Sequence, residues 1–275
     1  MPVHIQPWLV ARRVSLMTFV HRVMMMRPLR SLAVALFLFA VLPLRAQDLA
    51  ATCHASSSYD VTLKTDSLLF DRASPAPFHV ELQRGALRTD GVAVHVNAED
   101  QDRLALFERD LRALVPRVRV VARNGVDLAM RAMRDEADGM GLAPATRTEF
   151  DRRLGVHADQ LRRRIATSRS THDWQGDVAG EYANEVAADL LPVVAADLGQ
   201  QALNAALAGD LQSAANLRDR ASALAGNLQP RLRQRMQALR PQIEALCPAI
   251  QRLAELQQGV RGSDGRPLNL LQIDP

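Results

Sequence analysis

The feature that most constrains the fold is a change in hydrophobic period at Asn97. Between Tyr59 and Val96, apolar residues alternate with polar ones, which indicates strands that bury one face. After Asn97 the apolar residues recur every three or four positions, which indicates amphipathic helices. The alternating apolar positions are Val61 and Leu63, then Phe78, Val80 and Leu82, then Val92, Val94 and Val96. This order predicts an α+β, predominantly helical fold, in which a small N-terminal antiparallel β-meander is followed by amphipathic helices that form hairpins or a bundle.

Turn and helix-start signals mark the ends of these elements. Ser74-Pro75-Ala76-Pro77, Arg84-Gly85 and Thr89-Asp90-Gly91 are typical of turns between strands. Asn97-Ala98-Glu99-Asp100 is typical of a helix start, because an asparagine can cap the helix and acidic residues favour its first turn. Gly139-Met140-Gly141 closes the helical series that follows.

The first helical series contains a proline, and two further helical segments follow it. Pro116 lies inside the first series and is expected to separate two helices or to kink one. The next helix runs through Phe150, Leu154, His157, Leu161 and Ile165. The Ala-rich segment from Asp177 to Leu207 is apolar over much of its circumference, and we predict that it is the most buried helix.

The C-terminal part carries a heptad pattern. Its apolar seam consists of Leu232, Met236, Leu239, Ile243, Leu246, Ile250 and Leu253. The seam predicts a long helix or a helical hairpin of the coiled-coil kind. Pro230, Pro241 and Pro248 argue against a straight coiled-coil rod, since each removes a backbone donor. Gly262-Ser263-Asp264-Gly265 predicts a turn, and the segment from Leu268 to Ile273 predicts a last short strand.

Residues 1–46 have the order of a secretory signal peptide. A basic stretch from Met26 to Arg30 precedes an apolar run from Ser31 to Leu44, and Ala46 supplies the small residue that signal peptidase needs. We predict cleavage after Ala46 and export to the periplasm. The alternative is an uncleaved membrane anchor, which is disfavoured because a spanning helix needs roughly 20 apolar residues. Three consecutive methionines before the basic stretch favour the interpretation of residues 1–23 as an over-extended gene start.

The predicted organisation is therefore a signal peptide at 1–46, a small β-meander at 47–97, a helical region at 98–261, and a turn with a final strand at 262–275. Residues 1–46 hold six arginines and no acidic residue. Without them, 28 basic residues face 30 acidic ones, a net charge of −2 in place of +4. This balance argues against nucleic-acid binding, and cleavage would leave no stable membrane span.

Both cysteines, Cys53 and Cys247, lie after the predicted cleavage site. An even cysteine count in an exported chain favours a disulfide between them. Metal binding by two lone cysteines is disfavoured. Lipidation of Cys53 is also disfavoured, because the preceding Ala50-Ala51-Thr52 is not a lipobox. Closure of the chain by this bond would bring the segment from Leu268 to Ile273 near the meander, where it could add a strand.

Two groups of residues are candidates for chemistry. His79, Glu81 and His95 fall on the polar phase of two predicted strands and could hold zinc, but no ligand-spacing motif supports a metal site, and an ordinary solvent face is the preferred interpretation.

His172-Asp173-Trp174 lies near Ser168 and Ser170, which suggests a serine–histidine–aspartate triad. A loop with a helix cap explains these residues better, since no Gly-x-Ser-x-Gly elbow is present. The sequence contains neither His-Glu-x-x-His nor a phosphate-binding glycine loop, so we predict no catalytic residue and no cofactor.

The layout resembles that of the YggN-like family of uncharacterised exported proteobacterial proteins. The resemblance rests on the early Cys53, on Thr89-Asp90-Gly91-Val92, on Asn97-Ala98-Glu99 opening a helix, and on helices that lead to the late Cys247. It implies a periplasmic location and no established activity.

Three functions follow as hypotheses. The leading one is a non-enzymatic binding or interaction module of the cell envelope, with an unknown envelope protein or ligand as its partner. The alternative is an envelope enzyme of unrecognised class. A purely structural coiled coil is disfavoured by the three prolines in the seam.

Overall fold

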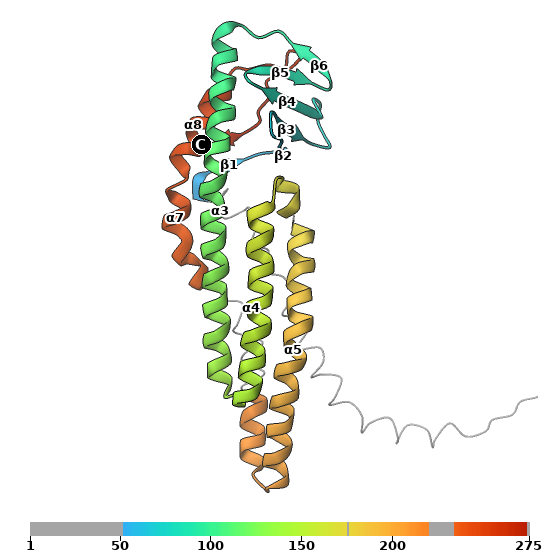
Figure 1. Ribbon diagram of the computed structural model, residues 1–275, viewed down its shortest axis with the longest axis vertical. Coiled ribbons are helices and arrows are strands. Elements are labelled where there is room, and N and C mark those ends of the chain that lie inside the picture. Colours follow the sequence, from blue (N-terminus) through green and yellow to red (C-terminus); the bar gives the residue numbers. More distant parts are fainter. Residues whose placement is uncertain (1–51, 175, 220–233, 274–275) are drawn as a thin grey trace, which may run out of the picture. The chain divides into compact units, whose positions relative to one another are not determined.

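The computed structural model describes residues 52–174, 176–219 and 234–273 (Figure 1). The predicted signal peptide and its cleavage after Ala46 lie outside the described residues. Among the described helices, none is long and apolar enough to cross a membrane.

Five antiparallel strands form the predicted meander, and each pairs with its neighbours in chain order. They are β2 (Asp60–Leu63), β3 (Leu68–Asp71), β4 (His79–Gln83), β5 (Ala86–Thr89) and β6 (Val92–Val94). One face of the sheet is buried, as the alternation predicts, because Val80 and Leu82 are almost inaccessible to solvent. The buried face does not extend to the sheet's end, where Phe78 is 45% and Val92 is 56% exposed.

The positions of the turns depend on two glycines. Asp90 and Gly91 both have positive φ angles, of 48° and 80°, and form the two-residue turn between β5 and β6. Gly85 has a φ of 81°, and a Cβ atom there would collide with the backbone oxygen of Gln101. The turn between β4 and β5 therefore needs glycine both for its conformation and for its close approach to the following helix.

The first helix, α3 (Ala98–Met140), begins and ends where the sequence predicts. The side chain of Asn97 accepts a hydrogen bond from the backbone N–H of Asp100, and Gly141 caps the other end in a left-handed conformation. Of the two alternatives predicted for Pro116, a break between two helices is wrong, because α3 is a single helix of 43 residues that contains this proline. Burial of α3 on both sides of Pro116, at Leu114 and Val126, outweighs the lost backbone bond.

Arginines of α3 attach other parts of the chain to this helix. The guanidinium of Arg103 donates to the backbone oxygens of Glu255 and Gln258. Arg117 donates to the backbone oxygen of Ala245, and Arg119 donates to that of Ser168. Such bonds satisfy carbonyls at segment ends that would otherwise lack a partner.

After Gly141 the chain forms α4 (Pro144–Thr167), a 3₁₀ turn η2 (Thr171–Trp174) and α5 (Gly176–Leu207). The helix α4 packs against both α3 and α5 (Figure 1). The prediction that α5 is the most buried helix is wrong. Among the α5 side chains that the structure describes, Leu190 is the one that is buried. Its apolar character comes mainly from alanines, which cover little surface, and α5 packs chiefly on one neighbour.

The C-terminal heptad segment is split into η3 (Gln237–Leu239), α7 (Arg240–Glu244) and α8 (Cys247–Gln257). Of the two predicted alternatives, a long helix and a helical hairpin, the long helix is therefore wrong for residues 237–257. Pro241 and Pro248 each lie at the start of a short helix, where a missing backbone N–H costs nothing. The seam still forms a buried face, through Leu239, Leu246, Ile250 and Leu253. Leu232 and Pro230 lie outside the described residues.

The predicted last strand is present in short form as β7 (Gln272–Ile273). It does not join the meander. It pairs antiparallel with β1 (Ala55–Ser56) in a separate two-stranded sheet. The predicted disulfide is confirmed, since the Sγ atoms of Cys53 and Cys247 are bonded at 2.05 Å and their Cα atoms lie 5.1 Å apart.

Two apolar clusters support these elements. The first joins the sheet, the first half of α3, α8 and the C-terminal segment, and includes Phe70, Phe107, Leu253 and Leu268. The second joins the later part of α3 to α4 and α5, and includes Val126, Phe150, Leu154 and Leu190. The loop between α4 and α5 runs from the second cluster back to the sheet, because Ser170 forms an isolated bridge with Thr62 of β2.

Candidate functional site

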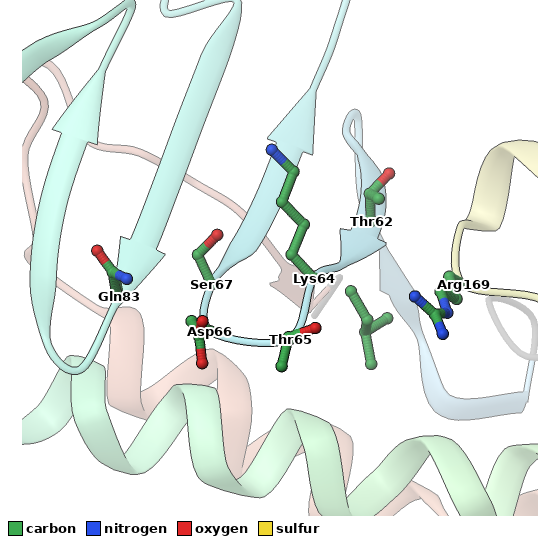
Figure 2. A pocket seen from close by; sticks show the side chains of 8 residues that line it. Thr62, Lys64, Thr65, Asp66, Ser67, Gln83 and Arg169 are labelled. Carbon is green, nitrogen blue, oxygen red and sulfur yellow. The ribbon is translucent and has the colours of Figure 1, made fainter.

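A hollow of about 540 Å³ lies where the sheet meets the loop after α4. It is lined by residues 62–67 of the β2–β3 hairpin, by Gln83 at the end of β4, and by Arg169 of the loop. Figure 2 shows Lys64 and Arg169 on separate sides of the hollow, with Thr65 and Asp66 at the turn between β2 and β3. The residues come from three separate segments, which the fold brings together.

The helix α3 fixes the hairpin turn of this hollow. The guanidinium of Arg112 donates to the backbone oxygens of Lys64 and Ser67 at 2.8 and 2.9 Å. Glu108, one turn earlier, pairs with Arg112 at 3.0 Å and accepts from the backbone N–H of Arg84 at 2.8 Å. Because Glu108 is 8% exposed, its charge is satisfied mainly by these protein groups. One ion pair thus holds two neighbouring turns of the sheet.

The loop after α4 covers the free edge of β2. The backbone N–H of Leu63 donates to the backbone oxygen of Arg169, and that of Val61 donates to the hydroxyl of Thr171, each at 2.8 Å. Such cover protects an edge strand from pairing with other chains. It also fixes the backbone that carries Arg169 beside the turn that carries Lys64.

The residues of the suggested triad have structural partners in this loop. The hydroxyl of Ser168 donates to Asp173 at 2.9 Å and accepts from the indole N–H of Trp174 at 2.8 Å. His172 instead faces Asp60 of β2, with 3.5 Å between its Nδ1 and the Oδ2 of Asp60. Ser170 accepts from the hydroxyl of Thr62. The structure therefore brings the serine and the aspartate together but places the histidine elsewhere.

The side chains of Lys64 and Arg169 are the two cations that line the hollow among the described residues. In the part of the chain that the structure describes, neither the ammonium of Lys64 nor the guanidinium of Arg169 has an ion-pair or hydrogen-bond partner. Both residues are exposed. Asp66, the one acidic residue that lines the hollow, also lacks such a partner. Sequence reasoning missed these residues, because single basic residues far apart in the chain carry no pattern.

The suggested zinc ligands are not brought together. His79 pairs with Asp71 of the neighbouring strand, with 2.6 Å between Nδ1 and Oδ1. Because Leu87 of β5 pairs with Val94, His95 falls beside Ala86, at the end of the sheet away from His79. Glu81 lies in the middle of β4, between the two ends of the sheet, and pairs with Arg88 of β5. Across the described residues, no group of three or more His, Cys, Asp or Glu side chains could hold a metal ion.

We predict that purified protein holds no stoichiometric zinc and that His79→Ala with His95→Ala leaves its metal content unchanged. Two imidazoles at different ends of a sheet cannot share one ion, whose bonds to nitrogen are about 2.0–2.1 Å long. Elemental analysis of dialysed protein tests this. Stoichiometric zinc that the double variant loses would contradict it.

A polar cluster with one buried member, His157, lies between α4 and α5. His157 is 8% exposed, and its Nε2 lies 3.0 Å from a carboxylate oxygen of Asp189. Arg153 donates to the other oxygen of Asp189 at 2.8 Å. The hydrogen bond from His157, followed by the charge of Arg153, holds the pKa of Asp189 below its ordinary value. The Nδ1 atom of His157 is buried and has no partner among the described residues, so the pair attaches α5 to α4 without presenting a base to solvent.

On the same helix, Glu149 is predicted to titrate at an unusually low pH. Hydrogen bonds from Arg152 and Arg153 lower the pKa of Glu149 from 4.5 to about 2. Because the folded-state pKa is lowered, the ionised carboxylate contributes stability above its ordinary pKa, and this contribution is lost as the pH falls toward 2. A carboxyl NMR titration measures it. Arg152→Gln should raise the pKa of Glu149, whereas Arg163→Gln, at an exposed position of α4, should not. A wild-type pKa at the ordinary value would contradict the prediction.

Comparison with known protein families gives a match for this chain. A model of the family described as "Protein of unknown function (DUF2884)" matches residues 53–264. No curated protein matches the chain, and no solved structure does. The match covers the sheet, the described helices and both cysteines. The YggN-like name and the exported character remain predictions from the sequence.

Proposed function

Because the chain belongs to the DUF2884 family of proteins of unknown function, we propose its function from its own residues: it is a non-enzymatic binding module of the cell envelope. The observation that carries this proposal is the hollow between the hairpin turn and the loop after α4, which presents cations that have no partner among the described residues. Polar groups left without partners at a fixed concave surface are available to a ligand. The described lining of the hollow holds one aspartate and no histidine, cysteine or glutamate, so this lining favours binding over acid–base chemistry.

The proposed location is the periplasm. The order of the basic stretch, apolar run and Ala46 in residues 1–46 supports export. The disulfide supports it independently, since such bonds persist mainly in oxidising compartments. Intact-mass measurement of the protein from a periplasmic fraction tests the location. A chain that begins at Gln47 is expected, and a chain that retains residues 31–44 would refute cleavage.

Photocrosslinking in cells tests the binding role. A photoreactive amino acid at Thr65 or Gln83, both exposed and both lining the hollow, should give one defined adduct on illumination. The matched control places the same amino acid at Arg163, which is exposed on α4 and does not line the hollow. Mass spectrometry identifies the adduct. The proposal fails if hollow and control positions give the same products or if neither gives any.

A further inference from the structure

We propose that the hollow recognises an anionic group, a carboxylate or a phosphate, through Lys64 and Arg169; this inference rests on the proposed binding function and names its ligand class. Lys64 and Arg169 are its two cations, and Asp66 is its one acid. The next residue after Gln83, Arg84, also has a guanidinium without a partner among the described residues. Among the described residues that line the hollow, two positive charges therefore face one negative charge, although the chain after Ala46 has a net charge of −2.

The contrast with other arginines of the chain supports this assignment. Two other arginines near the hollow have protein partners: Arg112 is held by Glu108 and by two backbone oxygens, and Arg119 is held by Ser168. Arg169 is set apart because its backbone is fixed by Leu63 while its side chain is free among the described residues. In Figure 2 its guanidinium points from the loop toward the turn. A fixed backbone reduces the entropy lost on binding.

The hydroxyl of Ser67 adds an uncharged donor to the same hollow. The residue as a whole is 5% exposed and lines the hollow, yet its hydroxyl has no hydrogen-bond partner among the described residues. Its oxygen still has contact with solvent. A ligand in the hollow can therefore accept a hydrogen bond from this hydroxyl. The hydroxyl of Thr65 offers a second donor at the turn.

The lining also excludes other kinds of recognition. Among the residues that the structure describes, no aromatic side chain lines the hollow, so this lining offers no ring on which a sugar or a base could stack. One carboxylate against two cations disfavours a cationic ligand. Charge-assisted hydrogen bonds from ammonium and guanidinium groups are the strongest interactions available here, and they select carboxylate or phosphate oxygens.

NMR titration with inorganic phosphate and with citrate tests the anionic assignment on the full-length mature protein. Both probes should shift the backbone amides of residues 62–67 and of Arg169, and added sodium chloride should weaken the effect. Lys64→Gln and Arg169→Gln should each weaken binding about fivefold, as expected for a partly exposed charge pair. Asp66→Asn should strengthen binding, because it removes the one repelling charge. Arg163→Gln, which removes an exposed and equally unpartnered cation on α4, should leave binding unchanged.

Vesicles distinguish a lipid headgroup from a free anion. Binding to phosphatidylglycerol vesicles but not to phosphatidylcholine vesicles, lost in Arg169→Gln, supports the assignment with a lipid as the source. Binding of the free probes with the same dependence supports it with a small anion as the source. The assignment is overturned if no anionic probe shifts these amides, or if all the variants bind equally. If the anionic assignment is overturned but photocrosslinks form at the hollow, the proposed binding function still holds. If no photocrosslinks form either, both the anionic assignment and the binding function are rejected.

Discussion

Loss of the disulfide between Cys53 and Cys247 should lower the free energy of unfolding by about 5 kcal/mol, the value that loop entropy gives for so long a closed segment. The two cysteines are 194 residues apart, so the bond restricts most of the chain after residue 46 in its unfolded state. In the folded state, the bond joins the segment before β1 to the start of α8. Because Cys53 is 3% exposed, its replacement also removes a buried contact.

Urea unfolding of oxidised protein, reduced protein and a Cys53→Ala, Cys247→Ala variant measures this effect. The reduced protein and the variant should unfold at similarly low urea concentrations, and adding reductant to the variant should change nothing. Equal stability of the oxidised and reduced proteins would contradict the prediction. Removal of native disulfides typically costs about 2–5 kcal/mol, so the change is well outside the error of such measurements.

The elements that the sequence predicts correctly are those whose own residues determine them. The strands β2 and β4 follow from alternation, and α3 starts at Asn97 because a side-chain cap and acidic residues stand together there. Alternation does not predict the strand β3. Leu68, Leu69 and Phe70 are consecutive apolar residues without alternation, although Leu68 and Phe70 are buried on the core face.

The errors arise where tertiary packing overrides a local pattern. Pro116 does not interrupt α3, because burial on both sides of it holds the helix together. The Ala-rich α5 lies mostly exposed, since composition cannot tell how many neighbours a helix has. The heptad seam correctly predicts which face of the C-terminal segment is buried. It fails to predict length, because Pro241 and Pro248 start new helices.

The candidate site cannot be predicted from the sequence, because it depends on how two distant segments of the chain pack together. Lys64 and Arg169 line the same hollow only because backbone bonds attach the loop after α4 to the edge of β2, and nothing in either segment specifies that attachment. The suggested triad of this loop has a structural role instead. Ser168 and Asp173 hold the loop together, and His172 attaches it to β2. The serine, histidine and aspartate of this loop therefore have structural roles, whereas Lys64 and Arg169, which belong to no motif, line the hollow.

Phe107→Ala should lower the free energy of unfolding by about 3–5 kcal/mol, the usual range for truncating a buried phenylalanine. Phe107 is 2% exposed on α3, and its ring centroid lies 6.1 Å from that of Phe70 in β3. Since Phe70 also meets the ring of Tyr59 at 6.4 Å, the three rings connect the helix to the sheet. Alanine would leave a cavity in this cluster, because the surrounding helix and strands cannot collapse into it.

Urea unfolding again gives the measurement, and Leu207→Ala is the matched control. Leu207 is 78% exposed near the end of α5, so its truncation should change stability by less than about 0.5 kcal/mol. Loss of Phe107 should also weaken hydrogen-exchange protection in β3 and β4, because both strands pack on α3 through this cluster. If Phe107→Ala and Leu207→Ala were equally stable, the helix and sheet would not share a single core, and the hollow between the β2–β3 turn and the loop after α4 would lack the rigid support on which its binding role depends.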